Sequence, residues 1–88
     1  MTVTSTHVKN PAEGWDISAS AKADQGEKIA RVQIVLNGFT EYEKSFDPPI
    51  NNWQQLLPQR GQYPGNNAVE VIATNDKGDD TESQDSWS

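Results

Sequence analysis

A run of carboxylates near the end of the sequence is the first group of residues that could do chemistry. Acidic side chains are dense between residues 76 and 85, where Lys77 is the only cation. Oxygen ligands of this kind suit Ca²⁺, which takes roughly six to eight of them. The candidate calcium ligands are Asp76, Asp79 and Asp80. Their spacing does not follow the calcium loop of EF-hand proteins, and a solvated acidic segment is the alternative interpretation.

Aromatic side chains beside amides offer a second chemistry, in which a sugar ring stacks on a flat aromatic platform. The ligand-binding candidates are Tyr63, Trp53 and Phe39, and Asn and Gln residues flank the first two. Trp53 and Trp15 also suit a core, because only 33% of the residues are hydrophobic and few large side chains exist to fill one. Tyr63, in a polar segment, is the aromatic residue that we expect to be exposed.

Groups suited to catalysis are scarce. His7 is the only histidine, and the chain has no cysteine. Nucleophilic catalysis needs an activated nucleophile with a base in reach, and no motif in the sequence orients His7. Glu41 and Glu43 occupy alternate positions of an expected strand, which is typical of a solvated face. We therefore expect a protein that is not an enzyme, with no cofactor and no disulfide.

Length and charge restrict the class of protein further. The chain has 88 residues, enough for one domain spanning residues 1–88. Seven basic and thirteen acidic side chains give a net charge of −6, which argues against nucleic acid as a partner. No apolar run is long enough for a membrane helix, and residues 1–14 lack the pattern of a signal peptide. We expect a monomer without membrane insertion.

Alternation of apolar and polar residues predicts the elements that must position these groups. Residues 15–23, 29–36 and 68–74 alternate with period two between regularly spaced turn signals, which is typical of strands with one buried face. The expected inward side chains are Trp15, Ile17, Ala19, Ala21 and Ala23, then Val32, Ile34 and Leu36, and then Val69, Val71 and Ala73.

Weaker strands are expected around these three. Residues 1–8 form an expected edge strand, Phe39–Phe46 follows a hairpin turn at Asn37-Gly38, and residues 52–57 form another strand. We place turns at Asp47-Pro48-Pro49 and from Pro58 to Asn66. Residues 80–88 are polar and suit either a last strand or a frayed tail. About seven short strands predict an all-β, antiparallel sandwich of two sheets, with its core within residues 15–80.

Two motifs resemble bacterial immunoglobulin-like domains. The segment from Ile29 to Gly38 ends in Asn-Gly, as strands of that family do, and Gly65 to Gly78 is similar to the family pattern G-x-N-x-V-x-V-x-A-x-D/N-x-x-G. The likeness covers roughly residues 15–80 and implies an immunoglobulin-like sandwich. Residues 58–64 and the polar last segment depart from the family pattern. In the second motif, Asn75 is expected to hydrogen-bond the turn backbone and Gly78 to close the turn.

The resemblance implies a non-catalytic module of a larger exported or cell-surface bacterial protein. Its expected role is that of a spacer, a scaffold or a protein-binding adhesion module. The first alternative is a carbohydrate-binding accessory module of a secreted hydrolase. The second alternative is a calcium-binding module. The expected partners are neighbouring domains of the parent chain and a protein or glycan ligand, met by the loops at Asp47–Asn52 and Pro58–Asn67.

Overall fold

Seven β-strands make up the part of the chain that the structure describes. The computed structural model describes residues 1–61 and 65–88. The strands are β1 (Thr2–Lys9), β2 (Trp15–Lys22), β3 (Ile29–Leu36), β4 (Phe39–Ile50), β5 (Asn52–Arg60), β6 (Asn67–Asn75) and β7 (Asp80–Trp87). No helix occurs among these residues, and hence none that could cross a membrane.

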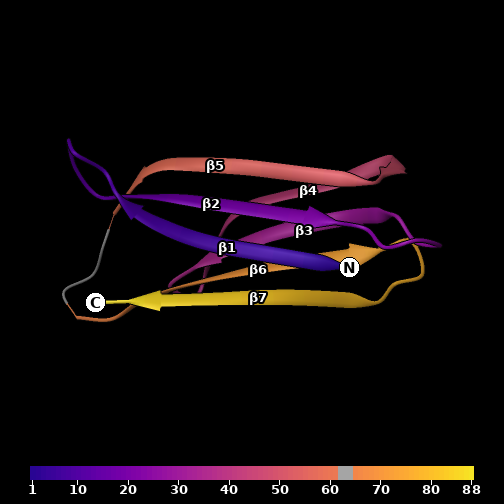
Figure 1. Cartoon of the computed structure of the whole chain (residues 1–88). Coiled ribbons are helices and arrows are strands. Elements are labelled where there is room, and N and C mark those ends of the chain that lie inside the picture. The colour runs from indigo at the N-terminus through magenta and orange to yellow at the C-terminus, as the bar shows by residue number, and fades with distance from the viewer. Residues whose placement is uncertain (62–64) are drawn as a thin grey trace.

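The strands form two sheets that pack face to face (Figure 1). One sheet has three strands in the order β1-β2-β5, and the other has four in the order β4-β3-β6-β7. Every hydrogen-bonded pair of neighbouring strands is antiparallel. The predicted fold class, an all-β antiparallel sandwich of two sheets, is confirmed.

Alternation along β2, β3 and β6 builds the core between the two sheets. Successive side chains of a strand point to opposite faces, so every second residue turns inward. The buried hydrophobic residues are Ile17, Ala19, Ala21, Ile29, Val32, Ile34, Leu36, Trp53, Leu57, Val69, Val71 and Ala73. Trp15 and Ala23, at the two ends of the predicted face of β2, are partly buried against this core. The predicted inward faces are therefore confirmed.

The strands that contain proline extend further than the sequence predicted. The expected turn at Asp47-Pro48-Pro49 is wrong, because β4 continues through it to Ile50, with a cis peptide bond before Pro48. The expected turn at Pro58 is also wrong, because β5 continues to Arg60. Both strands lie at the edge of their sheet, where one side of the backbone forms no ladder and proline is tolerated. The proposed partner loop at residues 47–52 is consequently mostly strand.

A tight hairpin at Asn37-Gly38 links β3 to β4, as the sequence predicted. Both residues have positive φ, 51° for Asn37 and 85° for Gly38, which is the requirement of a type I′ turn. Asn37 also joins the turn to β6, because its backbone N–H donates to the carbonyl of Ala68 and its Oδ1 accepts from the N–H of Ala68, each over 2.8 Å. The hairpin is thus held in register with the centre of its sheet.

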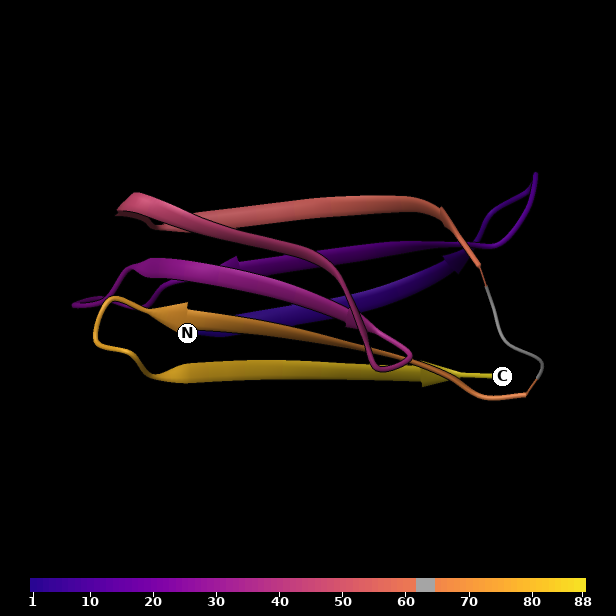
Figure 2. The same cartoon turned by 180° about the vertical axis from the view of Figure 1, so that it is seen from behind.

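The first and last strands lie beside each other where the two sheets meet. The hydroxyl oxygens of Ser5 and Ser83 are 2.9 Å apart, and Nδ1 of His7 is 2.5 Å from Oδ2 of Asp85. Both contacts join residues 78 positions apart, so β1 and β7 run in the same direction. The chain accordingly starts at one end of the molecule and finishes at the other (Figures 1 and 2).

Candidate functional site

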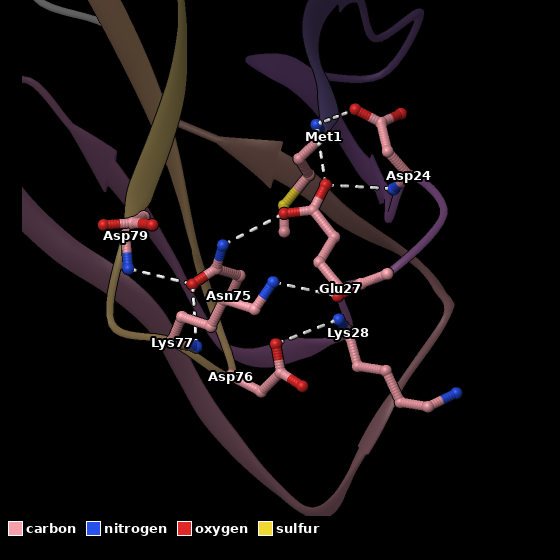
Figure 3. A network of polar contacts seen from close by, with 9 residues as sticks. Met1, Asp24, Glu27, Lys28, Asn75, Asp76, Lys77 and Asp79 are labelled. Carbon is pink, nitrogen blue, oxygen red and sulfur yellow. Dashed lines mark hydrogen bonds and ion pairs between the residues drawn. The ribbon is translucent and has the colours of Figure 1, made fainter.

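Asp76 and Asp79, two of the three predicted calcium ligands, lie at the end of the sandwich where the β2–β3 and β6–β7 turns meet (Figure 3), and Asp80 is the first residue of β7. We call this region the acidic end and define it by Asp24, Glu27, Asn75, Asp76 and Asp79. Asn75, which ends β6, is only 8% exposed. Its Oδ1 accepts hydrogen bonds of 2.9 Å from the backbone N–H groups of Lys77 and Asp79. The predicted role of Asn75 in the turn is confirmed, and Gly78 follows with a φ of 86°.

Glu27 connects the two turns through both of its carboxylate oxygens. Oε1 accepts a hydrogen bond of 3.0 Å from Nδ2 of Asn75. Oε2 accepts from the N–H of Asp24 over 3.0 Å and lies 2.9 Å from the amino group of Met1. The bond from Asn75, and then the ammonium group of Met1 and the N–H of Asp24, lower the pKa of Glu27 to about 2. Both oxygens of the Glu27 carboxylate are therefore engaged in contacts that join the β2–β3 turn to the β6–β7 turn and to the N-terminus.

Asp76 is likewise committed to backbone groups. Its Oδ1 accepts from the N–H of Lys28 over 3.2 Å, and its own N–H donates to the Lys28 carbonyl over 2.9 Å. Lys77 adds a bond of 3.1 Å from Nζ to the carbonyl of Gly26. These contacts fasten the β6–β7 turn onto the β2–β3 turn.

The three predicted calcium ligands do not converge. Asp80 accepts a hydrogen bond of 2.6 Å from the hydroxyl of Thr74. Figure 3 shows the carboxylate of Asp79 well apart from that of Asp76. Across residues 1–61 and 65–88, no group of three or more acidic or histidine side chains is placed to hold a metal ion. The polar side chains of the acidic end instead form hydrogen bonds within and between the two turns.

The aromatic candidates for ligand binding lie in different surroundings. Trp53 is 8% exposed and stacks on Tyr42, with ring centroids 5.9 Å apart. Phe39 is 64% exposed at the start of β4. Tyr63 lies outside the described residues. A buried ring such as that of Trp53 offers no open face to a sugar, so Trp53 and Phe39 do not make a shared platform.

A polar seam between β1 and β7 was missed by the sequence analysis. The seam consists of Ser5, His7, Ser83 and Asp85, and the His7 ring also stacks on Trp87 with centroids 4.3 Å apart and planes 10° apart. No nearby sequence motif orients His7, but in the structure Asp85 and Trp87, from the far end of the sequence, do so. The sequence signal was present, since His7 and Asp85 both hold odd positions of alternating strands, but the pairing of β1 with β7 cannot be read from spacing.

The polar seam gives His7 a structural setting. A histidine oriented by a carboxylate is a common catalytic arrangement, but it requires a nucleophile at the other ring nitrogen. The two hydroxyls one step along the seam, Ser5 and Ser83, are bonded to each other. The contact of His7 with Asp85 instead joins β1 to β7, two strands of different sheets that share no backbone hydrogen bonds.

Comparison with protein-family models, with curated proteins and with solved structures finds no match for this chain.

Proposed function

We propose that the chain is a non-catalytic, immunoglobulin-like module of a larger exported or cell-surface bacterial protein, and that it acts as a spacer or scaffold between neighbouring domains. One observation carries the proposal. Because β1 and β7 run in the same direction, the two chain ends lie at opposite ends of a molecule that measures 41 × 20 × 18 Å (Figures 1 and 2). A module of this shape separates its neighbours by its full length.

The order of the strands supports the immunoglobulin-like part of the proposal. In immunoglobulin domains the second strand pairs with the fifth, and the third, sixth and seventh strands lie together. The same neighbours occur here, with β2 beside β5 and β3 beside β6 and then β7. One strand differs from the constant-type arrangement, because β4 pairs with β3 instead of with β5. The resemblance over residues 15–80 points to the same class of domain.

The absence of an open aromatic platform at Trp53 favours the spacer role over glycan binding. The structural roles of the acidic side chains in the turns similarly favour it over calcium binding. Trp53 packs in the core, and the candidate calcium ligand Asp76 holds two turns together with Glu27.

Small-angle X-ray scattering on two copies joined directly, Ser88 to Met1, tests the proposal. A spacer predicts a particle whose longest dimension is about twice the 41 Å of one copy. The matched control carries a flexible glycine-serine linker of about ten residues, which broadens the distribution of distances. Two copies that fold back side by side, with a longest dimension close to that of one copy, would contradict the spacer role.

A further inference from the structure

The free edge of β5 has neither the charges nor the neighbouring strand that protect the other sheet edges. A sheet edge invites pairing with another chain, and proteins usually block it with charged side chains, lysine above all. The edge strands are β1 and β5 in one sheet and β4 and β7 in the other. β1 lies against β7 of the other sheet, β4 contains Lys44 among several acids, and β7 is acidic. β5 has no charged residue before Arg60 at its end, and Leu56 within it is 51% exposed.

The register of β5 identifies the backbone groups that face outward. The N–H of Ala23 donates to the carbonyl of Asn51 over 2.9 Å, and hydrogen-bonded pairs alternate along an antiparallel ladder. Continuing that register, the pairs of Ala21 with Trp53 and of Ala19 with Gln55 are the hydrogen-bonded ones. The residues between them, Gln54 and Leu56, therefore direct N–H and C=O to the free edge.

Two details of β5 agree with this assignment. The Leu56 carbonyl accepts a hydrogen bond of 3.1 Å from the side-chain amide of Gln55, which occupies the place of a neighbouring strand. Pro58, two residues beyond Leu56, has the same orientation and no N–H to leave unpaired. The usable edge thus runs from Asn52 to Leu56 and stops at Pro58.

The opposite sheet leaves apolar side chains poorly covered on this side of the sandwich. Tyr42 and Lys44 pair with Ile34 and Val32, so they point toward the other sheet. Ile34 and Val32 are fully buried, whereas Tyr42 is only half-buried and Lys44 is exposed. Phe46, next on the same face, is half-buried and lies under the ammonium group of Lys44, 5.5 Å from its ring centroid. A sheet of four strands faces a sheet of three, and β4 is covered only in part, by Trp53 stacked on Tyr42.

We propose that the free edge of β5 binds one extended segment of a partner protein, which adds a fourth strand to the three-stranded sheet and covers Tyr42 and Phe46 of β4. Strand addition of this kind derives its affinity from backbone hydrogen bonds and its specificity from alternate side chains. This inference goes beyond the spacer role and does not depend on it.

The surroundings define the chemistry of that segment. Every second side chain faces β4 and is apolar, because it meets the rings of Tyr42 and Phe46 and the hydrocarbon stem of Lys44 between them. The remaining side chains are uncharged or acidic, because the charged residues beside the edge are basic: Lys22 pairs with Asn52, and Arg60 ends β5. No proline falls among the central residues, since each must donate to the edge at Gln54 or Leu56.

A second copy of this chain fits the edge poorly. Pairing β5 with β5 of another copy would bring a second four-stranded sheet beneath the joined edge, and the two β4 strands would compete for the same space. The shortfall between the sheets is one strand, which a single segment fills.

The probe for the test is an acetylated and amidated heptapeptide in which valine alternates with threonine or glutamate. Amide hydrogen exchange of the 88-residue chain is followed by NMR with and without saturating peptide. The proposal predicts at least tenfold slower exchange at Gln54 and Leu56, and no change at Val8 on β1. A peptide with proline at its central position is expected to give no protection.

Two variants with the same added charge make the matched comparison. Leu56→Lys places a lysine on the proposed edge and is expected to weaken peptide binding at least tenfold. Val8→Lys changes the other exposed aliphatic residue of this sheet, 62% exposed on β1, and is expected to leave binding unchanged. Equal effects of the two variants would overturn the proposal, as would protection confined to β1 or β7. So would a concentration-dependent dimer without peptide, or binding of cellohexaose at Tyr42 in place of the peptide.

Discussion

At the scale of single residues, Glu27 is the side chain on which the acidic end depends. It joins two turns that are 48 positions apart in sequence through its bond with Asn75. Its pKa falls from 4.5 to about 2 in the folded chain, first because of Asn75 and then because of the Met1 ammonium group and the Asp24 N–H. A lowered folded-state pKa means stability that is fully present above about pH 4.5 and is lost as the pH falls toward 2.

The substitution Glu27→Gln tests this dependence. We expect a variant that is less stable than wild type at pH 7, because the charge and part of the hydrogen bonding are lost. Between pH 4.5 and pH 2 the wild type loses more of its stability than the variant does, so the two converge. Urea unfolding at pH 7, 4.5, 3 and 2 measures this, with Glu41→Gln on exposed β4 as the control. Parallel curves for wild type and Glu27→Gln would rule out the role assigned to this carboxylate.

Val71 tests the core at the same scale. Its side chain has no exposed surface at the centre of β6. Val71→Asp buries a carboxylate without a partner, and we expect a loss of about 3 kcal/mol or more, enough to unfold a domain of this size. Circular dichroism and thermal unfolding measure it, with Val8→Lys as an exposed control expected to stay within about 0.5 kcal/mol. A folded Val71→Asp would mean that β6 faces the other way.

At the scale of elements, the sequence predicted strands well where alternation was strong and poorly where proline intervened. The faces of β2, β3 and β6 followed from period two, because a strand with one buried face must alternate. The extents of β4 and β5 did not follow, because Pro48 and Pro58 signal turns unless a strand lies at a sheet edge. Edge position is a property of the topology. The polar seam depends on topology in the same way.

The polar seam makes β1 the strand whose attachment can be tested. β1 contributes no fully buried residue, and its bond from His7 to Asp85 joins it to the other sheet. A double-mutant cycle of His7→Phe and Asp85→Ala measures the coupling, with Phe keeping a flat ring against Trp87. We expect a coupling of about 0.5–3 kcal/mol by urea unfolding, and faster amide exchange in β1 than in β3. Additive effects would show that the two side chains act independently.

At the scale of the whole molecule, charge is distributed unevenly between the two outer faces. The outer face of the four-stranded sheet carries Glu43, Glu70, Asp80 and Glu82 against Arg31, which pairs with Glu43 through a hydrogen bond of 3.0 Å from Nε. The three-stranded sheet carries mostly hydroxyl and amide side chains outward. Four acids against one base on this face supply half of the net charge of −6, and like charges there repel and disfavour the compact state.

Salt should therefore stabilise this protein. Screening weakens the repulsion among the excess carboxylates, and it also weakens the ion pairs of Glu43 with Arg31 and of Glu27 with Met1. Thirteen acids against seven bases leave more repulsion than attraction to screen. We expect the urea midpoint at pH 7 to rise between 0.01 M and 0.5 M sodium chloride. The doubly neutralised variant Glu41→Gln, Glu82→Gln should show a smaller rise, because it has less repulsion to lose. A midpoint that falls with salt would mean that the ion pairs stabilise the folded chain by more than the repulsion among the excess carboxylates destabilises it.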